Sequence, residues 1–300
     1  MIEPLGGLGN QLFTYAVGLA NATRLDTELV VELCNFKNYE WHDYELGSFA
    51  NSIKSEISAD SGPRPVARGM ARFLRPRERP PVSASLSTTV EQEENNLFSE
   101  RFLAVSDNSR LKGYFQSWKY VEPVSVALDQ QLWALTKPSQ WFLEKTEELR
   151  NREPWIGLHI RLGNYQSLEE MGVVADIYYR RALGLLRDLG VNREVLIFTD
   201  SPEVLERRDF LVKGFSSELF ESDPTSSPLE NMLLLSLSEH LIMANSTFSW
   251  WAAWLGRKNG AQRRVIYPRP WINLESWDDR DLQRPDWIGL SREAAEDERK

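Results

Sequence analysis

The segment Trp155–Tyr165 limits the possible folds of this chain more than any other part of it. The apolar run Trp155–Ile160 is typical of a buried strand. Because side chains alternate along a strand, His159 and Arg161 are expected on one face, with Gly163 beginning the turn that ends the strand. In open α/β sheets ligands bind at the carboxyl ends of strands, and arginine suits forked anions such as phosphate. The segment therefore predicts an α/β sheet with an anion site at one edge.

The rest of the chain alternates short strands with helices, which favours two parallel α/β domains. Three hundred residues also fit about two domains of ordinary size. We expect an N-terminal domain over residues 1–150, a C-terminal domain over 151–290 and a charged tail over 291–300. The expected strands are 2–5, Thr27–Cys34, Glu194–Phe198, Leu211–Phe215, His240–Ala244 and Val265–Tyr267, and Leu111–Val121 is expected to be a strand that ends in a loop. The expected helices are 11–22, 124–135, 140–150, Asp176–Leu189, Leu229–Glu239 and Phe248–Leu255.

Charge and composition exclude several classes of protein. The net charge of −9 argues against a general nucleic-acid binder, which would normally be basic. The single cysteine, Cys34, cannot form an internal disulfide, and this fits a reducing compartment. The first residues lack the charged and apolar regions of a signal peptide, and no apolar run is long enough to span a bilayer. We therefore expect a cytoplasmic protein.

Two charged stretches interrupt the first half of the chain. Pro63–Pro81 holds six arginines among prolines and glycines, which suits a solvated insertion or, less well, a patch for anionic lipid or another anionic partner. The acidic stretch Glu91–Asn96 could offset its charge. The arginines are Arg64, Arg68, Arg72, Arg75, Arg77 and Arg79. Near the other end of the chain, Asp279-Arg280-Asp281 has D-x-D form and is interpreted as a solvated turn.

Polar residues follow three predicted strands of the second half. They are His159 with Arg161, Thr199 with Asp200, and the run Asn245–Thr247. The third group also opens a helix, whose free N–H groups and dipole favour an anion. The three strand ends together predict a pyrophosphate cradle, in which Asp200 or Glu230 could accept hydrogen bonds from a ribose or a base. The alternatives are a structural ion pair for Arg161 and helix capping for the serines and threonine.

Five motifs occur together in one order along the chain. They are G-G-L-G-N-Q-L-F at Gly6–Phe13, G-Y-F-Q-S-W-K-Y at Gly113–Tyr120, H-I-R at His159–Arg161, F-T-D-S at Phe198–Ser201 and N-S-T-F-S-W-W-A-A-W-L at Asn245–Leu255. The set resembles the α-1,2-fucosyltransferases of glycosyltransferase family 11, bacterial members in particular. The resemblance runs from Gly6 to about Ile288, with residues 37–110 outside it.

The resemblance implies a GT-B architecture, with two Rossmann-like domains facing across a cleft. It implies an inverting galactoside α-1,2-fucosyltransferase, a hexosyltransferase that moves L-fucose from GDP-β-L-fucose to O2 of a galactose in a glycan. GDP-fucose would be a co-substrate, with neither cofactor nor metal. The sequence itself holds no cysteine or histidine cluster of metal-ligand spacing. In such bacteria the acceptor is often a surface polysaccharide repeat, so peripheral contact with the inner membrane is also expected.

The resemblance also implies roles for individual residues. Arg161 would be catalytic, because it would stabilise the charge that develops on the β-phosphate. The donor would be bound by His159, Asp200, Asn245, Ser246, Thr247, Phe248, Ser249, Gly7, Gly9 and Asn10. Gln11, Gln116 and Trp118 are expected on the acceptor side. No carboxylate stands at a spacing that selects it as the general base.

Two positions depart from the family pattern H-I-R-R-G-D-Y. This chain has Leu162 for the second arginine and Asn164 for the aspartate. Period two places residue 162 on the face opposite Arg161, so the first arginine is the one expected to act. Two alternatives stay open: a GDP-sugar transferase with another sugar or linkage, and a non-catalytic homologue that only binds a GDP-sugar.

Overall fold

The computed structural model describes residues 1–33, 36, 42–48, 54–56, 89–135, 137–163, 172–202, 214–258, 262–274 and 277–293. They belong to two compact units, Met1–Leu128 and Asp129–Lys300. The division falls earlier than the expected boundary at 150, because helix α4 packs on α7 of the second unit. Several predictions lie outside the described residues, namely those for Cys34, for the arginines of 63–81, for Asn164 and for most of the tail.

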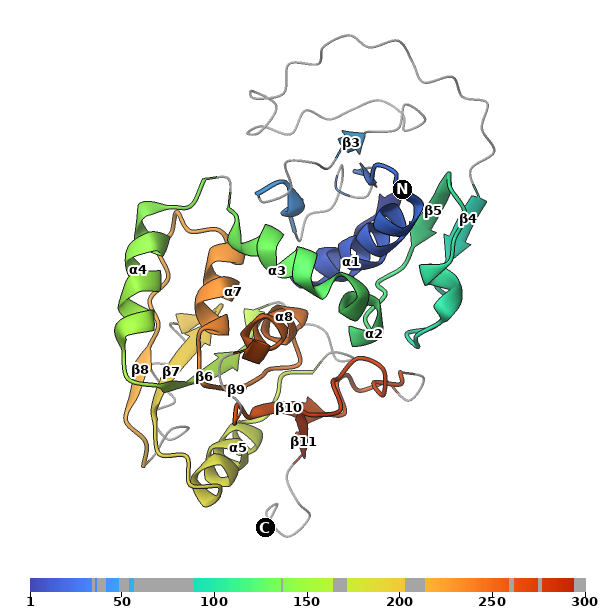
Figure 1. The fold of residues 1–300 in the computed structure, drawn as a ribbon. Helices are drawn as coiled ribbons and strands as arrows, with labels where there is room; N and C mark the ends of the chain where they lie inside the picture. Colours follow the sequence, from blue (N-terminus) through green and yellow to red (C-terminus); the bar gives the residue numbers. More distant parts are fainter. Residues whose placement is uncertain are drawn as a thin grey trace. The chain divides into compact units, whose positions relative to one another are not determined.

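The first unit is built on a five-stranded parallel sheet in the order β3-β2-β1-β5-β4. Its strands β4 and β5 can be seen side by side in Figure 1. Helix α1 packs closely on it: a Cβ at Gly18 would lie 2.6 Å from Ile2 Cγ2. The strand expected to end in a loop within 111–121 does so after Lys112, and a helix that Ser117 caps then begins at Trp118. The elements are β1 (Ile2–Glu3), α1 (Leu8–Leu25), β2 (Val30–Glu32), β3 (Lys54–Glu56), β4 (Thr89–Gln92), β5 (Ser109–Lys112), α2 (Trp118–Val121) and α3 (Ser125–Trp133), with 3-10 turns at Leu46–Ser48, Glu100–Leu103 and Glu122–Val124.

The second unit is built on a six-stranded parallel sheet in the order β11-β10-β9-β6-β7-β8. Its elements are α4 (Gln140–Asn151), β6 (Trp155–Ile160), α5 (Asp176–Asp188), β7 (Glu194–Thr199), β8 (Ser217–Leu219), α7 (Pro228–Ser236), β9 (His240–Ile242), α8 (Thr247–Leu255), a 3-10 turn at Gly256–Lys258, β10 (Val265–Arg269) and β11 (Ile288–Ser291). The strand expected over 211–215 lies slightly later, at β8, and residues 211–213 are outside the described part. Two parallel, Rossmann-like α/β units confirm the predicted fold class.

Strand β6 is central to the second sheet, and its two faces contact different layers of helices. Ile156, Leu158, Ile160 and Leu162 belong to a buried core that includes the apolar face of α5. The alternate residues point to the layer of α7 and α8, where a Cβ at Gly157 would lie 3.0 Å from the side chain of Leu235 (Figure 1). The period-two prediction is therefore confirmed, since Leu162 is 1% exposed on the face opposite Arg161.

The chain order of the strands makes β6 a switch point. From β6 the chain adds β7 and β8 on one side, then returns to add β9, β10 and β11 on the other. At such a point the loops after neighbouring strands leave in opposite directions, and this opens a crevice at the carboxyl edge. None of the described helices combines the length and the apolar character needed to cross a membrane.

Candidate active site

Arg161 follows β6 directly and is held by the first residue after the neighbouring strand β7. Its Nη1 atom donates to Asp200 Oδ2 at 2.9 Å, and the two side chains are 24% and 23% exposed. Asp200 Oδ1 also accepts a hydrogen bond from the backbone N–H of Leu162 at 2.9 Å. The ion pair considered for Arg161 is thus present. Because it leaves about a quarter of each side chain accessible, the pair orients the guanidinium without burying it.

Gly163 makes this arrangement possible. A Cβ at this position would overlap Asp200 Oδ2, and it would lie within 3.8 Å of Arg161 Cζ. Any larger residue would therefore have to displace the carboxylate that orients the arginine. The glycine of the H-I-R-L-G motif is explained by close packing, and not only by the turn predicted from sequence.

His159 lies two residues before Arg161, on the same face of the sheet, and packs against the first turn of α8. Its ring stacks on Phe248, with centroids 5.2 Å apart and planes inclined by 30°. Burial lowers the pKa of His159 to about 3, an effect that Asp200 opposes and Arg161 reinforces. The imidazole is therefore neutral near pH 7. Its buried Nδ1 atom has no hydrogen-bond partner within the described part of the chain.

These residues line a small cavity of about 150 Å³ at the carboxyl edge of β6 and β7. Its walls are partly aromatic, since Phe198 and Phe220 stack with centroids 4.1 Å apart. The lining residues are His159, Arg161, Phe198, Thr199, Asp200, Phe220, Ser222, Pro228, Asn231 and Phe248. Four of the predicted site residues, His159, Arg161, Asp200 and Phe248, are thus brought together. A space of this size can hold part of a nucleotide.

Asn231 is a member of this site that the sequence analysis missed. Its Nδ2 atom donates to Ser226 Oγ at 2.8 Å and to Ser227 O at 3.1 Å, while its buried Oδ1 atom accepts no hydrogen bond from described residues. The signal available was the sequence S-P-L-E-N, which predicts a capped helix start and places Asn231 on its first turn.

The start of α8 contributes both caps and accessible groups. Ser246 is the N-cap and accepts from Phe248 N at 3.3 Å. Ser249 is fully buried and donates to Ala244 O at 3.2 Å and to Ser246 O at 3.0 Å. Asn245, also fully buried, donates to Gly172 O at 3.1 Å. Thr247 and Phe248 are half-buried, so they are the predicted donor-binding residues of this run that solvent can reach.

The predicted residues of the first unit gather at the carboxyl edge of its sheet. Gln11 is fully buried, and its Nε2 atom donates to Gly6 O and to Asp43 O, both at 2.8 Å. Its Oε1 atom accepts from Glu45 N at 2.9 Å. The side chain therefore fastens the 43–45 segment to the glycine turn. This internal role differs from the contact with acceptor that we expected for Gln11.

The neighbours of Gln11 show how the turn is built. Asn10 Oδ1 accepts from Gln116 Nε2 at 2.9 Å, which joins the two motifs that contain them. Gly7 lies under the ring of His42, and a Cβ there would be 3.2 Å from it. Gly9 is buried within the first turn of α1, and Trp118 begins α2. His42 was not singled out from sequence, because only the folded turn brings it to Gly7.

Two other acidic residues have roles that differ from the expected ones. Glu230 is 4% exposed and accepts backbone hydrogen bonds from Ser139 N at 2.6 Å and Ser227 N at 2.8 Å. It therefore binds the N-cap residues of α4 and α7, completing the capping box of α7, and is not available to a ribose or a base. The turn predicted at 279–281 is present and Arg280 is 72% exposed, but the side chain of Asp279 is only 13% exposed and accepts from Trp271 N at 3.2 Å. No group of three or more potential metal ligands occurs among the described residues, and independence of metal stays a prediction.

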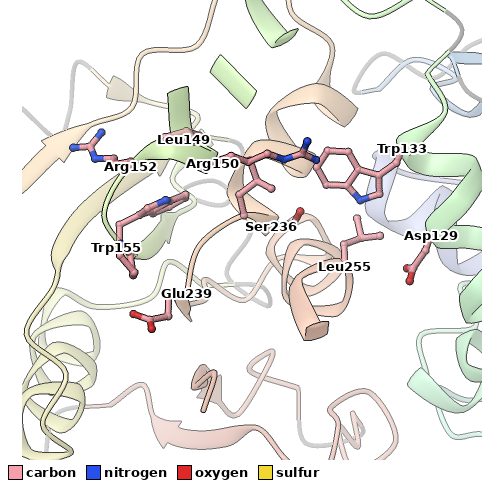
Figure 2. A pocket seen from close by; sticks show the side chains of 11 residues that line it. Asp129, Trp133, Leu149, Arg150, Arg152, Trp155, Ser236, Glu239 and Leu255 are labelled. Atoms are coloured by element: carbon pink, nitrogen blue, oxygen red, sulfur yellow. The ribbon is translucent and has the colours of Figure 1, made fainter. Parts of the chain in front are cut away.

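A larger cavity, of about 600 Å³, lies at the opposite, amino-terminal edge of the same sheet (Figure 2). Trp155 begins β6 there, and Arg150 stacks over Trp133 with its Cζ atom 5.3 Å from the ring centroid. Its other charged groups are engaged: Asp129 pairs with Arg257 at 2.8 Å. This cavity is not at the switch-point edge, so it is a weaker candidate for the active site.

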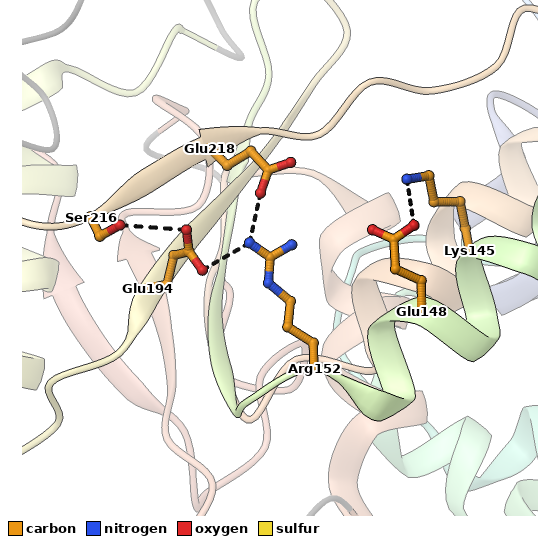
Figure 3. Close-up of polar contacts among 6 residues, drawn as sticks. All are labelled: Lys145, Glu148, Arg152, Glu194, Ser216 and Glu218. Atoms are coloured by element: carbon orange, nitrogen blue, oxygen red, sulfur yellow. Dashed lines mark hydrogen bonds and ion pairs between the residues drawn. The ribbon is translucent and has the colours of Figure 1, made fainter.

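Arg152, which also lines the larger cavity, belongs to a structural cluster (Figure 3). It lies 2.8 Å from Glu194 and 2.6 Å from Glu218, and so joins the end of α4 to β7 and β8. These contacts raise the pKa of its guanidinium above the usual value. The cluster fastens a helix to a sheet edge and leaves the small cavity as the candidate active site.

The fold and the strand-end site together define an α/β protein equipped to bind an anionic ligand. The model of glycosyl transferase family 11 matches residues 104–291, and the chain belongs to this family. It is 24% identical to an α-1,2-colitosyltransferase of Escherichia coli, over 96% of this chain and 97% of that protein. It is also 24% identical to the O-antigen biosynthesis glycosyltransferase WbnK of Escherichia coli, over 91% of this chain and 97% of the relative.

Solved structures show a lower degree of similarity. Fucosyltransferase NodZ from Bradyrhizobium has a TM-score of 0.46 and 16% identity, over 84% of this chain and 91% of that chain. POFUT1 in complex with GDP has a TM-score of 0.43 and 12% identity, over 88% of this chain and 96% of that chain. The family membership established from sequence identifies the protein as a glycosyltransferase.

Proposed function

We propose that the protein transfers L-fucose from GDP-β-L-fucose to a glycan hydroxyl, O2 of a galactose residue, with inversion at the anomeric carbon. The observation that carries the proposal is the guanidinium of Arg161, held at 2.9 Å by Asp200 beside the small cavity at the switch point. A guanidinium has five N–H donors, which exceeds what one carboxylate accepts. Arg161 can therefore serve a diphosphate while Asp200 fixes its direction.

In the proposed reaction, the acceptor oxygen attacks the anomeric carbon from the face opposite GDP. The bond from this carbon to the β-phosphate oxygen breaks, and negative charge grows on the departing diphosphate. Arg161 and the N–H groups at the start of α8 stabilise this charge more in the transition state than in the ground state. The neutral ring of His159 and the side chain of Asn231 offer polar atoms to the nucleoside.

Colitose is a second candidate for the transferred sugar. The relative named as an α-1,2-colitosyltransferase aligns with nearly the whole chain, which favours it as an alternative to fucose. The relative named for O-antigen biosynthesis supports a polysaccharide repeat as the acceptor. A non-catalytic role has less support, because Leu162 lies in the hydrophobic core and removes no group from the cavity. Contact of the 63–81 segment with the inner membrane stays a prediction.

The test is transfer by the purified protein with a panel of donors and acceptors. GDP-fucose, GDP-colitose and GDP-mannose are offered with galactose-terminated oligosaccharides. GDP release gives the rate, and NMR of the product gives linkage and anomeric configuration. We expect an α-1,2-linked product from GDP-fucose. Binding of GDP without turnover of any donor would contradict the proposal, and preference for GDP-colitose would select the second candidate.

The role of Arg161 has its own matched test. Arg161→Ala should lower kcat by about 10²–10³-fold, the usual loss when one donor to a developing oxyanion is removed. Arg193→Ala is the control, because Arg193 is also paired with a carboxylate, Glu239, at 2.9 Å but lies outside the cavity. Both variants should show unchanged far-UV circular dichroism. Wild-type turnover by Arg161→Ala would remove this residue from the mechanism.

A further inference from the structure

Another cavity, of about 460 Å³, lies at the carboxyl edge of the second sheet. Its lining includes Arg269 and Ser291, the last residues of the neighbouring strands β10 and β11 (Figure 1). Because the strands of this sheet run parallel, the cavity lies at the same edge as the small cavity beside Arg161. Its volume falls within the roughly 300–1,000 Å³ that small-molecule sites usually have.

The order of the strands places this cavity beyond the diphosphate end of the proposed donor site. The small cavity includes Phe198 of β7 and Phe220, which follows β8, and this end suits the nucleoside. Arg161 after β6 and the start of α8 after β9 come next along the edge. Neighbouring strands are about 4.8 Å apart, so β10 and β11 lie about 10 and 14 Å from β6. A sugar unit beyond the reacting centre would therefore reach this part of the edge.

Tryptophan and carboxylate side chains form much of the wall, and this combination suits a neutral sugar. Trp277 is half-buried and lies over a wall that also contains the buried Trp271. Aromatic faces pack on the C–H faces of sugar rings, and carboxylates accept hydrogen bonds from hydroxyl groups. The described lining residues include two carboxylates, Asp278 and Asp279, and one guanidinium, Arg269. Unlike the site beside Arg161, this set does not favour a phosphate.

The two carboxylates are held in place by the chain itself. Asp279 accepts from Trp271 N at 3.2 Å, and its Oδ1 atom lies 3.7 Å from Arg269 Nη2. Asp278 pairs with Arg280 and accepts from the backbone N–H of this residue at 3.0 Å. These contacts with Arg280 lower the pKa of Asp278. Asp278 is therefore ionised near neutral pH and acts as a hydrogen-bond acceptor.

Trp277 and Arg269 have features that suit a ligand of several units. The indole N–H of Trp277 is buried and has no acceptor within the described part of the chain. Buried tryptophan N–H groups usually have one, so no described hydrogen bond fixes this ring, and it can turn onto a ligand. Arg269 is 58% exposed, which leaves this end of the cavity open to solvent. A glycan that continues beyond the site needs such an opening.

The wall of the cavity is fastened to the start of α8. Arg292 Nη1 donates to Trp271 O at 3.1 Å. Its guanidinium packs against Gly172, where a Cβ would overlap it. Gly172 O in turn accepts from Asn245 Nδ2 at 3.1 Å, directly before the N-cap of α8. The cavity is thus tied to the proposed diphosphate site, as joint action on one pair of substrates requires.

We propose that this cavity is an acceptor subsite, which binds a neutral sugar unit of the glycan beyond the unit that receives the transferred sugar. The proposal rests on the proposed function. The sugar ring stacks on Trp277, its hydroxyl groups donate to Asp278, and Arg269 donates to the ring oxygens at the open end. These contacts are made to a unit that does not react, so they lower the KM for the acceptor and leave kcat unchanged. The second unit would then bind part of the acceptor as well as the donor.

The kinetic test compares acceptors of different lengths. The wild type should have a lower KM for a galactose-terminated tetrasaccharide than for methyl β-galactoside, because only the longer acceptor reaches the subsite. Trp277→Ala should lose this preference. Its KM for the tetrasaccharide should rise about 5–30-fold, the usual effect of removing a tryptophan that anchors a ligand, while the KM for GDP-fucose stays unchanged. Trp133→Ala is the matched control, since Trp133 is also half-buried but lines the cavity at the opposite edge.

Binding without donor provides the second measurement. Saturation-transfer NMR should detect the tetrasaccharide on the wild type, on Trp133→Ala and on Trp277→Phe, which keeps an aromatic face, but not on Trp277→Ala. Circular dichroism checks that each variant is folded. A wild-type length preference in Trp277→Ala, or displacement of the tetrasaccharide by GDP, would overturn the proposal. A wild type that binds the tetrasaccharide but transfers no sugar would reject the proposed function and retain the subsite.

Discussion

Replacement of Gly163 by alanine should impair catalysis far more than stability. The added Cβ would overlap Asp200 Oδ2, so the carboxylate must rotate away. Rotation breaks its contact with Arg161 Nη1 and its hydrogen bond from Leu162 N, both 2.9 Å long. The backbone hydrogen bond is worth about 1 kcal/mol. The ion pair is worth up to about 1 kcal/mol, because solvent screens a partly exposed pair.

The free energy of unfolding should therefore fall by only about 1–2 kcal/mol in Gly163→Ala. The guanidinium of Arg161, however, loses the carboxylate that orients it. A displacement of about 1 Å at a reacting centre can lower the rate on the order of 10²-fold. Initial rates of GDP release from GDP-fucose measure the catalytic effect, and urea denaturation followed by circular dichroism measures the stability.

The matched control is Gly184→Ala in helix α5, where an added Cβ meets no atom of the described residues within 4 Å. Alanine in a helix interior is more stable than glycine by about 0.5–1 kcal/mol, so this variant should be slightly stabilised and fully active. A Gly163→Ala enzyme with wild-type kcat would refute the reasoning. It would mean that the Asp200–Arg161 contact does not position the guanidinium that we propose acts in the transfer.

Two further predictions concern stability. Because burial lowers the pKa of His159 to about 3, the unfolded chain binds more protons below pH 6.5, and stability should fall as the pH drops toward 3. The loss is about 2 kcal/mol at pH 5, and urea denaturation between pH 7.5 and 5 should show it in the wild type but not in His159→Gln. Glu230→Ala removes the acceptor for the buried N–H groups of Ser139 and Ser227, the N-cap residues of α4 and α7, and should cost about 2–3 kcal/mol in thermal or urea unfolding, whereas Glu230→Gln should cost about half as much. A loss under 0.5 kcal/mol in Glu230→Ala would contradict its capping role.

Local pattern was sufficient for much of the fold. The strand predicted over Trp155–Ile160 has these bounds in the structure, and the strand predicted at Glu194 ends one residue later than expected. Hydrophobic runs and alternation involve only neighbouring residues, so they can be recognised without knowing which strands pair with one another. Of the strand predicted at 211–215, the described residues 214 and 215 are not in a strand. The short, exposed strand β8 has no apolar pattern, and it forms because it pairs with β7.

The candidate site was predictable only in part. Alternation along β6 and β7 placed His159, Arg161 and Asp200 together, since parallel neighbours in register share a face. Whether a polar side chain meets a ligand or another part of the chain depends on distant partners. Gln11 and Glu230 were expected at ligands, but they bond backbone groups 34 and 91 residues away.

The sequence by itself determined the alternating elements, the two parallel sheets and the strand end at which an arginine emerges, because these follow from short-range spacing. The tertiary structure decided how each polar group is used, because hydrogen-bond partners are chosen across the fold. Thus it assigned Asp200 to orient Arg161, made Leu162 a core residue and directed Gln11 to the backbone of the 43–45 segment.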